Sequence, residues 1–235
     1  MDLYEIADIC VKMSAIGRTF VQAEKFRTDL PSEPCVEISV TEAEMNSLAK
    51  RFPDLKDNDI WYLLSGSDFY RKLIDYNGFL LHSSAVCVGG NAYLFSGQSG
   101  IGKSTHTSLW QQLFGEKCFI LNDDKPAIRF VDDNIFAYGT PWSGNHDISV
   151  NTRAPVKSLC FIGRGETNKI FRLSESHAAF SILSQSSIIR SNEQCDKLIS
   201  LIEEFVKKVP VYKLECIPDE SAARLSYETR SGEKL

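Results

Sequence analysis

One glycine-rich segment has the residue types and the spacing that hold phosphate. Residues 97–104 read Gly-Gln-Ser-Gly-Ile-Gly-Lys-Ser, which matches the pattern G-x-x-x-x-G-K-[ST]. In this pattern the glycines let backbone N–H groups turn toward phosphate oxygens, and the helix that follows adds partial positive charge. An apolar run precedes the segment and a helical run follows it, as the pattern requires. The sequence therefore predicts a nucleotide site, with ATP and Mg²⁺ (or Mn²⁺) as cofactors.

The side chains of this loop have distinct expected roles. Lys103 should reach the β- and γ-phosphates, and the hydroxyl of Ser104 should ligate the metal. The predicted nucleotide-binding residues are Gly97, Ser99, Gly100, Ile101, Gly102, Lys103, Ser104 and Thr105. The alternative is a glycine-rich turn without a ligand, which the matching context on both sides disfavours.

A pair of acids follows at a distance that suits this loop. Asp123 and Asp124 come directly after an apolar run at 118–121, about twenty residues beyond Lys103. One helix and one returning strand fill that distance, so the acids should emerge beside the loop. One carboxylate would hold the metal, and the other would accept a proton from an attacking hydroxyl. We expect Asp124 to share the metal with Ser104 and Asp123 to act in catalysis, although the sequence leaves both roles open to both acids.

Two hairpins surround this loop and predict a mixed sheet. The run "SAVCVGGNAYLFSG" contains two apolar segments joined by Gly-Gly-Asn, and "AIRFVDDNIFAYG" turns at Asp-Asp-Asn. A sheet made only of βαβ units would not enter its phosphate loop from a hairpin. Further expected elements are a helix at 103–114, strands at 156–162 and 211–216, and helices at 175–184, 193–208 and 218–228.

His82 stands directly before the first hairpin. Because the hairpin arms run antiparallel, the start of the first arm should lie near the loop that ends the second arm. A histidine there can bind a metal, contact the γ-phosphate or polarise a carboxylate, and the alternative is a packed or capping histidine. We expect His106, one turn into the helix after the loop, either to pack or to be exposed, and His146 and His177 have no group of reactive residues around them in the sequence.

The first 75 residues carry no recognisable chemistry and predict a supporting lobe. The expected elements are strands at 9–13 and 35–40, a helix that begins at a Thr41–Glu44 capping box, and a helical segment from 57 to 78. We therefore divide the chain into a lobe at 1–75 and a catalytic core at 76–235, with one continuous domain as the alternative.

Composition excludes several classes of protein. The 235 residues carry a net charge of −5 without a stripe of Lys and Arg, which argues against an extended nucleic-acid surface. The apolar runs are too short to span a membrane, and the N-terminus lacks the pattern of a secretory signal. Seven cysteines are scattered singly, which fits neither a disulfide framework nor a zinc site. We expect a soluble cytoplasmic protein with reduced cysteines, and a homo-oligomer is compatible with the sequence.

The segments "LHSSAV", "YLFSGQSGIGKST" and "FILNDDKPAI" together carry a family resemblance over about residues 80–140. They resemble the kinase core shared by the HPr kinase/phosphorylases and the ATP-dependent phosphoenolpyruvate carboxykinases. The later "YGTPWSG" and "LECIPDESAARL" look like the small HPr-kinase-like proteins, including those that phosphorylate lasso-peptide precursors. The resemblance implies an α/β P-loop core with a mixed sheet, to which we add a small N-terminal α+β lobe.

The same resemblance implies an ATP-dependent kinase that phosphorylates a hydroxyl, with serine or threonine of a peptide or protein as the expected acceptor. It implies that Asp123 or Asp124 is the catalytic acid/base and that His82 lies at the centre of phosphoryl transfer. Alternatives are a small-molecule hydroxyl kinase and a nucleotide-binding regulatory protein with little catalysis. Carboxykinase activity is disfavoured, because Leu63 stands where those enzymes have a metal-binding lysine.

Three further residues are candidates for the acceptor side of the site. Lys125 and Arg153 could steady charge on the transferred group, and Trp142 lies in a turn-rich segment that could contact the acceptor. The respective alternatives are a solvated lysine, a loop arginine and a buried anchor.

Overall fold

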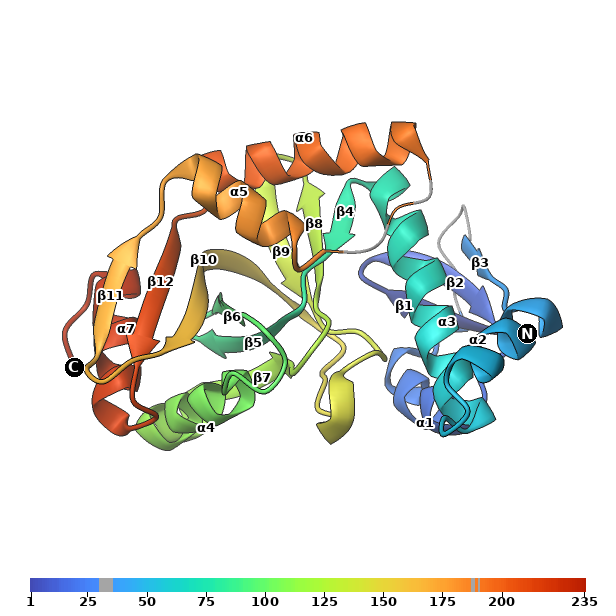
Figure 1. Ribbon diagram of the computed structural model, residues 1–235, viewed down its shortest axis with the longest axis horizontal. Coiled ribbons are helices and arrows are strands. Elements are labelled where there is room, and N and C mark those ends of the chain that lie inside the picture. Colours follow the sequence, from blue (N-terminus) through green and yellow to red (C-terminus); the bar gives the residue numbers. More distant parts are fainter. Residues whose placement is uncertain (30–35, 187–188, 190) are drawn as a thin grey trace.

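The computed structural model describes residues 1–29, 36–186, 189 and 191–235 of the chain, and it contains two β-sheets (Figure 1). The small sheet has the order β1-β2-β3, with β1 (Asp2–Ile6), β2 (Ile9–Met13) and β3 (Val36–Ile38). The large sheet has nine strands in the order β4-β8-β9-β10-β6-β5-β7, and β12 joins it by pairing with β10 and β11. Parallel and antiparallel pairs both occur in it, so the predicted α/β class with a mixed sheet is confirmed.

The strands of the large sheet are β4 (Gly78–Leu80), β5 (Ser83–Val88), β6 (Asn91–Ser96), β7 (Cys118–Asn122), β8 (Ala127–Val131), β9 (Asn134–Tyr138), β10 (Arg153–Arg164), β11 (Lys169–Arg172) and β12 (Val211–Cys216). The long strand β10 changes partners along its length. Its first three residues pair with β9, its later residues pair with β6 and β12, and a bulge separates Val156 from Ser158. Because a bulge bends and twists a strand, this is where the sheet curls.

The hairpin of β5 and β6 positions the glycine-rich segment at residues 97–104, which we call the phosphate loop, relative to the rest of the site. Its antiparallel register pairs Ser83 with Ser96, so His82 lies beside the point where β6 enters the loop. The helix α4 (Lys103–Phe114) leaves the loop, and β7 returns to pair with β5. The loop, His82 and the acid pair therefore meet at one end of these strands, as the sequence predicted.

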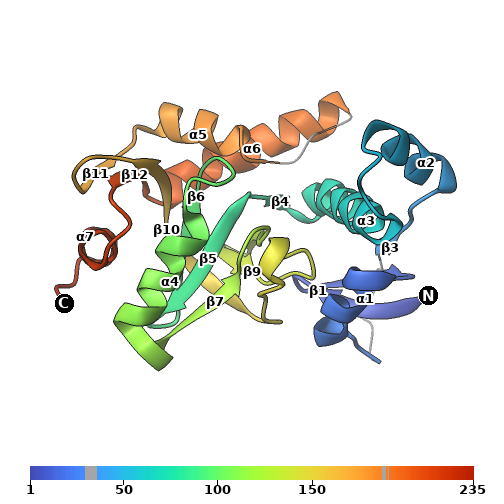
Figure 2. The same cartoon turned by 60° about the horizontal axis from the view of Figure 1, so that its bottom comes forward.

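Helices cover both faces of the large sheet. They are α4, α5 (Glu175–Leu183), α6 (Asn192–Lys208) and α7 (Glu220–Ser231). Alternate residues of β5 point to opposite faces, as the period of a strand requires. Val86 packs in a cluster with Trp110 of α4 and Tyr227 of α7, whereas Ala85 packs in a cluster with Phe205 of α6. Figures 1 and 2 show α4 and α7 on one side of the sheet and α5 and α6 on the other.

The N-terminal part packs against the large sheet through shared aromatic residues. Its helices are α1 (Gly17–Ala23), α2 (Glu42–Arg51) and α3 (Asp57–Leu73), and the predicted capping box of Thr41 and Glu44 begins α2. Phe69 of α3 stacks on Trp142, with ring centroids 4.9 Å apart, in a cluster that also contains Tyr138 of β9. The predicted division near residue 75 thus crosses one hydrophobic cluster, and it stays a prediction.

Some local expectations need correction. Cys10 is disulfide-bonded, contrary to the expectation of wholly reduced cysteines. Among the other described cysteines, four are buried and all are free, as expected: Cys87, Cys118, Cys160, Cys195 and Cys216. The strand predicted at 35–40 is β3 at Val36–Ile38, and its first residue, Cys35, lies outside the described residues. Within the described ranges, none of the helices has the length and apolar character to cross a membrane.

Candidate functional site

The phosphate loop turns through backbone conformations that only glycine adopts easily. Gly100 and Gly102 have φ values of +75° and +109°, and a Cβ at either position would meet none of the described atoms within 4 Å. The requirement for glycine here therefore comes from the backbone conformation and not from crowding. The turn leads directly into Lys103, the first residue of α4, so the first backbone N–H groups of the helix face the loop.

Lys103 is folded into this loop. Its side chain is buried, and its Nζ donates hydrogen bonds to the carbonyl oxygens of Gly97 (3.0 Å) and Gln98 (3.3 Å). Burial lowers the pKa of Lys103, while the nearby carboxylates of Asp124 and Asp123 oppose this shift. A cation held among carbonyl oxygens at the loop is placed to exchange them for phosphate oxygens.

Asp123 is the carboxylate that lies against the loop helix. It is buried, and Ser84 Oγ donates to its Oδ1 at 2.9 Å. Ser104 Oγ donates to its Oδ2 at 3.2 Å. The structure thus brings Ser104 to Asp123, whereas the sequence predicts Ser104 and Asp124 as the metal ligands. The reason is that Asp123, the first residue after β7, faces α4, whereas the next residue, Asp124, faces His82 and Lys125.

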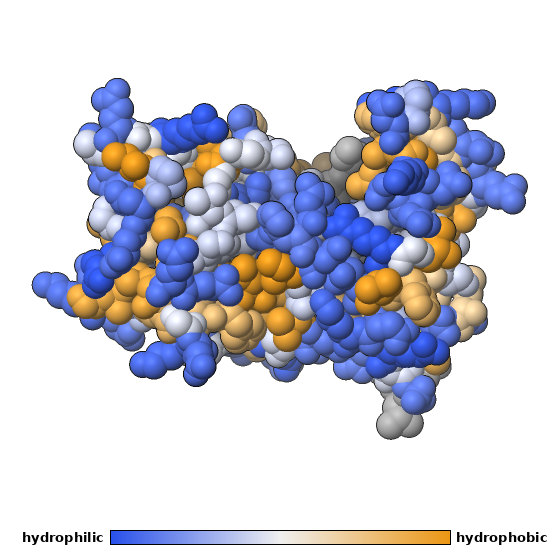
Figure 3. Space-filling view, turned by 90° about the horizontal axis from the view of Figure 1, so that it is seen from below, coloured by the Kyte–Doolittle hydropathy of each residue, from blue (hydrophilic) through white to orange (hydrophobic). Residues whose placement is uncertain are grey.

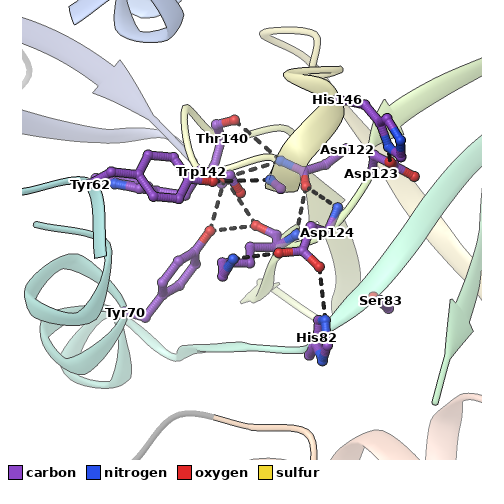
Figure 4. Close-up of polar contacts among 12 residues, drawn as sticks. Tyr62, Tyr70, His82, Ser83, Asn122, Asp123, Asp124, Thr140, Trp142 and His146 are labelled. Atoms are coloured by element: carbon purple, nitrogen blue, oxygen red, sulfur yellow. Dashed lines mark hydrogen bonds and ion pairs between the residues drawn. The ribbon is translucent and has the colours of Figure 1, made fainter. Parts of the chain in front are cut away.

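Asp124 has different partners. His82 Nε2 lies 2.8 Å from its Oδ1, and the ammonium of Lys125 contacts its Oδ2 (Figure 4). Burial alone would raise the pKa of Asp124, but the hydrogen bonds and charges of His82 and Lys125 hold this pKa below its ordinary value. The carboxylate is therefore ionised at neutral pH.

Hydrogen bonds fix the backbone at Asp124 and at His82. The Oδ1 of Asn122 accepts from the N–H groups of Asp124 and Lys125, at 3.1 and 2.7 Å, which closes the turn after β7. Its Nδ2 donates to Thr140. On the other side, the carbonyl of His82 accepts from Ser96 Oγ at 2.7 Å. The acid pair and the histidine are thus positioned by the strand ends that carry them.

His146 belongs to the site, although no group of reactive residues lies near it in the sequence. Its Nδ1 lies 2.6 Å from Asp123 Oδ2, and its side chain is 60% exposed. It sits in the short 3₁₀ turn Gly144–His146, which packs against the acid pair. A Cβ at Gly144 would come within 2.5 Å of Asp124 Cβ. The local signal was the turn-rich "GTPWSGN", but nothing in it showed where the turn would fold.

These residues line a cavity of about 750 Å³. One wall is the phosphate loop, with His82 and the acid pair at its end. The opposite wall comes from the N-terminal part, and includes Arg18 of α1 with Asp59 and Tyr62 of α3. Figure 3 shows polar side chains through the middle of the molecule seen from below, with apolar patches on either side. The cavity is large enough for a nucleotide phosphate chain and a second reactant.

The far wall is tied to the 144–147 segment. Arg18 Nε pairs with Asp147 at 2.6 Å, and its guanidinium lies over the ring of Tyr62. The N–H of Gly144 donates to the Tyr62 hydroxyl at 3.0 Å. Burial raises the pKa of Tyr62 to about 12. Tyr62 therefore stays protonated and keeps a hydroxyl proton to donate.

The three candidates for the acceptor side of the site, Lys125, Trp142 and Arg153, lie in different surroundings. Lys125 lines the cavity, as expected. Trp142 is fully buried, and its Nε1 donates to Ser65 Oγ at 3.1 Å, which matches the alternative of a buried anchor. Arg153 forms an ion pair with Asp8 and a hydrogen bond with Tyr138. It is absent from the described residues that line the cavity. The structure thus does not bring Arg153 to the acid pair.

The donor set also bears on a metal ion. Among the described residues, no group of three or more His, Cys, Asp or Glu side chains could hold a metal by itself. Mg²⁺ does not require such a group, because it is usually bound by one or two protein oxygens together with substrate phosphates and water. The Ser104 hydroxyl and the Asp123 carboxylate supply hard oxygen donors of this kind beside the loop.

Comparison with known proteins gives one family. Residues 56–218 match the model of a family described as SynChlorMet cassette protein ScmC. No curated protein matches the sequence. A solved structure, the Hpr(Ser) kinase/phosphatase from Coxiella burnetii, is 13% identical, with 65% of this chain and 93% of that chain covered at a TM-score of 0.35. Because the family match runs from the start of α3 beyond the end of β12, over more than half of the chain, this protein belongs to the ScmC family of SynChlorMet cassette proteins.

Proposed function

We propose that this protein is an ATP-dependent kinase that transfers the γ-phosphate to a hydroxyl, with serine or threonine of a peptide or protein as the acceptor. The observation that supports it is the division of the acid pair: Asp123 faces Ser104 at the loop helix, and Asp124 faces His82 on the side of the open cavity. Two carboxylates with separate partners suit two separate roles. The resemblance of the sequence to HPr kinases supports the same activity.

Ser104 and Asp123 are the residues that would hold Mg²⁺, which reverses the assignment of Asp124 as the metal ligand. When bound, Mg²⁺ neutralises charge on the phosphate oxygens. Lys103 exchanges its bonds to Gly97 and Gln98 for oxygens of the β- and γ-phosphates. Gly97, Ser99, Gly100, Ile101, Gly102 and Thr105 complete the cradle.

Asp124 acts as the catalytic base in this proposal. Its carboxylate accepts the proton of the acceptor hydroxyl as the oxygen attacks the γ-phosphorus, and ADP leaves on the opposite side. His82, hydrogen-bonded to Oδ1, fixes the orientation of the carboxylate. Lys125, on Oδ2, places a second positive charge beside the reacting group.

The acceptor binds on the side of the cavity that Arg18, Asp59 and Tyr62 line. We place the protein in the cytoplasm, where ATP and Mg²⁺ are supplied, and we propose neither a nucleic-acid nor a membrane partner.

The test uses the full chain, ATP, Mg²⁺ and a degenerate library of serine and threonine peptides, with mass spectrometry to detect phosphorylation. Wild type should phosphorylate a subset of the library, and Asp124→Asn should reduce the rate about 10²- to 10⁴-fold. Lys103→Met should abolish the reaction, and Lys117→Met, at an exposed lysine outside the cavity, should not.

Other outcomes separate the alternatives. Phosphorylation of small alcohols alone would identify a small-molecule kinase. ATP binding without turnover, equal in wild type and Asp124→Asn, would contradict the kinase proposal and indicate a regulatory nucleotide-binding protein.

A further inference from the structure

A second, smaller cavity opens beside the acid pair. Its volume is about 230 Å³, and Tyr62, Leu63 and Lys125 line both this cavity and the large one. The two cavities thus adjoin at Lys125, the residue that directly follows Asp124. Whatever occupies the smaller cavity lies next to the group that reacts at Asp124.

One face of α3 forms the floor of this side pocket. Leu63, Gly66, Ser67 and Tyr70 line it, at the i, i+3, i+4 and i+7 spacing of a single helical face. Gly66 has no side chain to fill the space, and Trp142 closes the pocket against it, since a Cβ at Gly66 would approach the indole to 2.8 Å. Leu80 lines the pocket from β4.

The polar atoms of two aromatic walls, Tyr70 and Trp142, already have partners within the protein. Tyr70 donates its hydroxyl hydrogen to the carbonyl of Lys125, and its oxygen lies 2.9 Å from Thr140 Oγ1. Trp142 Nε1 donates to Ser65 Oγ. Figure 4 shows the hydroxyl of Tyr70 directed toward Thr140. What these side chains offer a ligand is therefore ring surface, and burial of an apolar group against it is favourable.

We propose that this side pocket receives the apolar side chain of the residue next to the phosphorylated serine or threonine in an acceptor peptide. The proposal rests on the proposed kinase function. The size is suitable, because a closed apolar cavity of about 150 Å³ holds a benzene molecule. Neighbouring residues of a peptide are about 3.8 Å apart at Cα, which matches a pocket that shares its wall with the catalytic cavity. The expected guests are leucine, methionine and phenylalanine.

The first test varies the peptide and the pocket together. In a library with a fixed serine, wild type should phosphorylate peptides with Leu, Met or Phe beside the serine with a kcat/KM about tenfold or more above that of peptides with Ala. Ser67 is exposed on α3 at the edge of the pocket, so Ser67→Phe fills the pocket without disturbing the core. In Ser67→Phe, the ratio of kcat/KM for the apolar peptides to kcat/KM for the Ala peptides should fall toward one. It should persist in Ser200→Phe, the same change at an exposed position of α6.

The second test needs no turnover. Ligand-observed NMR should detect binding of N-acetyl-leucinamide in preference to N-acetyl-glutamine amide to wild type, and this preference should be lost in Ser67→Phe. Equal weak binding of both probes overturns the proposal that the pocket prefers apolar side chains. Phosphorylation without a preference for apolar neighbours overturns the inference and leaves the kinase intact. An absence of peptide phosphorylation overturns the proposed function. The NMR measurement then tests by itself whether the pocket binds apolar side chains.

Discussion

His146 Nδ1 and Ser104 Oγ approach the same carboxylate oxygen, Oδ2 of Asp123, at 2.6 and 3.2 Å. A side chain from the 144–146 turn thus meets the first turn of α4 on one acid. Partners of this kind orient a carboxylate toward a metal without ligating the metal themselves. We propose that His146 is a positioning residue for Asp123.

Removal of that partner should weaken metal use. We expect His146→Ala to raise the Mg²⁺ concentration for half-maximal ATP turnover about tenfold, because the carboxylate loses its fixed orientation. The measurement is a Mg²⁺ titration of the initial rate at saturating ATP. His177→Ala is the control, since His177 lies exposed on α5 and bonds to Ser174. An unchanged Mg²⁺ dependence in His146→Ala would refute the role.

The two acids should fail in different ways when altered. Asp123→Asn should weaken the binding of Mg²⁺-ATP, measured by calorimetry, because Ser104 loses its charged partner. Asp124→Asn should leave that binding close to wild type and lower kcat, because the proton acceptor is lost. The reverse pattern would show that Asp124 holds the metal and Asp123 is the base.

Gly144 should be required for Asp124 geometry. Gly144 and Gly232 both have positive φ, at +73° and +79°, so alanine at either should cost about 1–2 kcal/mol of backbone strain. Only at position 144 would the new Cβ collide with Asp124. Urea unfolding should show a destabilisation of Gly144→Ala at least as large as that of Gly232→Ala, while kcat falls only in Gly144→Ala. Equal kcat in the two variants would mean that the turn can move without displacing the acid.

Buried His106 should make the fold sensitive to acid. Burial, aided by the charge of Arg230, lowers the pKa of His106 to about 3, and its Nε2 lies 3.1 Å from Ser226 Oγ. Between this value and the ordinary pKa of about 6.5, the unfolded chain binds a proton that the folded chain does not. Stability is therefore full above pH 6.5 and is lost as the pH falls.

The expected size follows from the same linkage. Between pH 7 and pH 5, this histidine should account for about 2 kcal/mol of lost unfolding free energy. Urea unfolding of wild type and His106→Gln at both pH values measures it, because the variant lacks the titrating group. Parallel losses in the two proteins would show that His106 does not carry the effect.

Local signals in the sequence were sufficient for the half of the site that lies on the strands. The glycine pattern, the Gly-Gly-Asn hairpin and the helix-plus-strand distance to the acids depend on residues close together in the chain. Once a hairpin forms, its register places His82 beside the loop without further information, since Ser83 must pair with Ser96. The capping box of α2 and the strand β2 could be predicted for the same reason.

The tertiary structure alone decided the partners of the acids and the far wall of the cavity. Which way Asp123 and Asp124 point depends on how β7 ends, and the contact of His146 with Asp123 depends on the path of a long loop. Arg153 meets Asp8 across 145 residues, and Trp142 meets Ser65 across 77. No periodicity or short motif encodes such distances, because they arise only when α3 and the large sheet bury their apolar faces against each other. The glycine-rich loop was thus determined by the sequence itself, whereas the place that we propose for the acceptor comes from that packing.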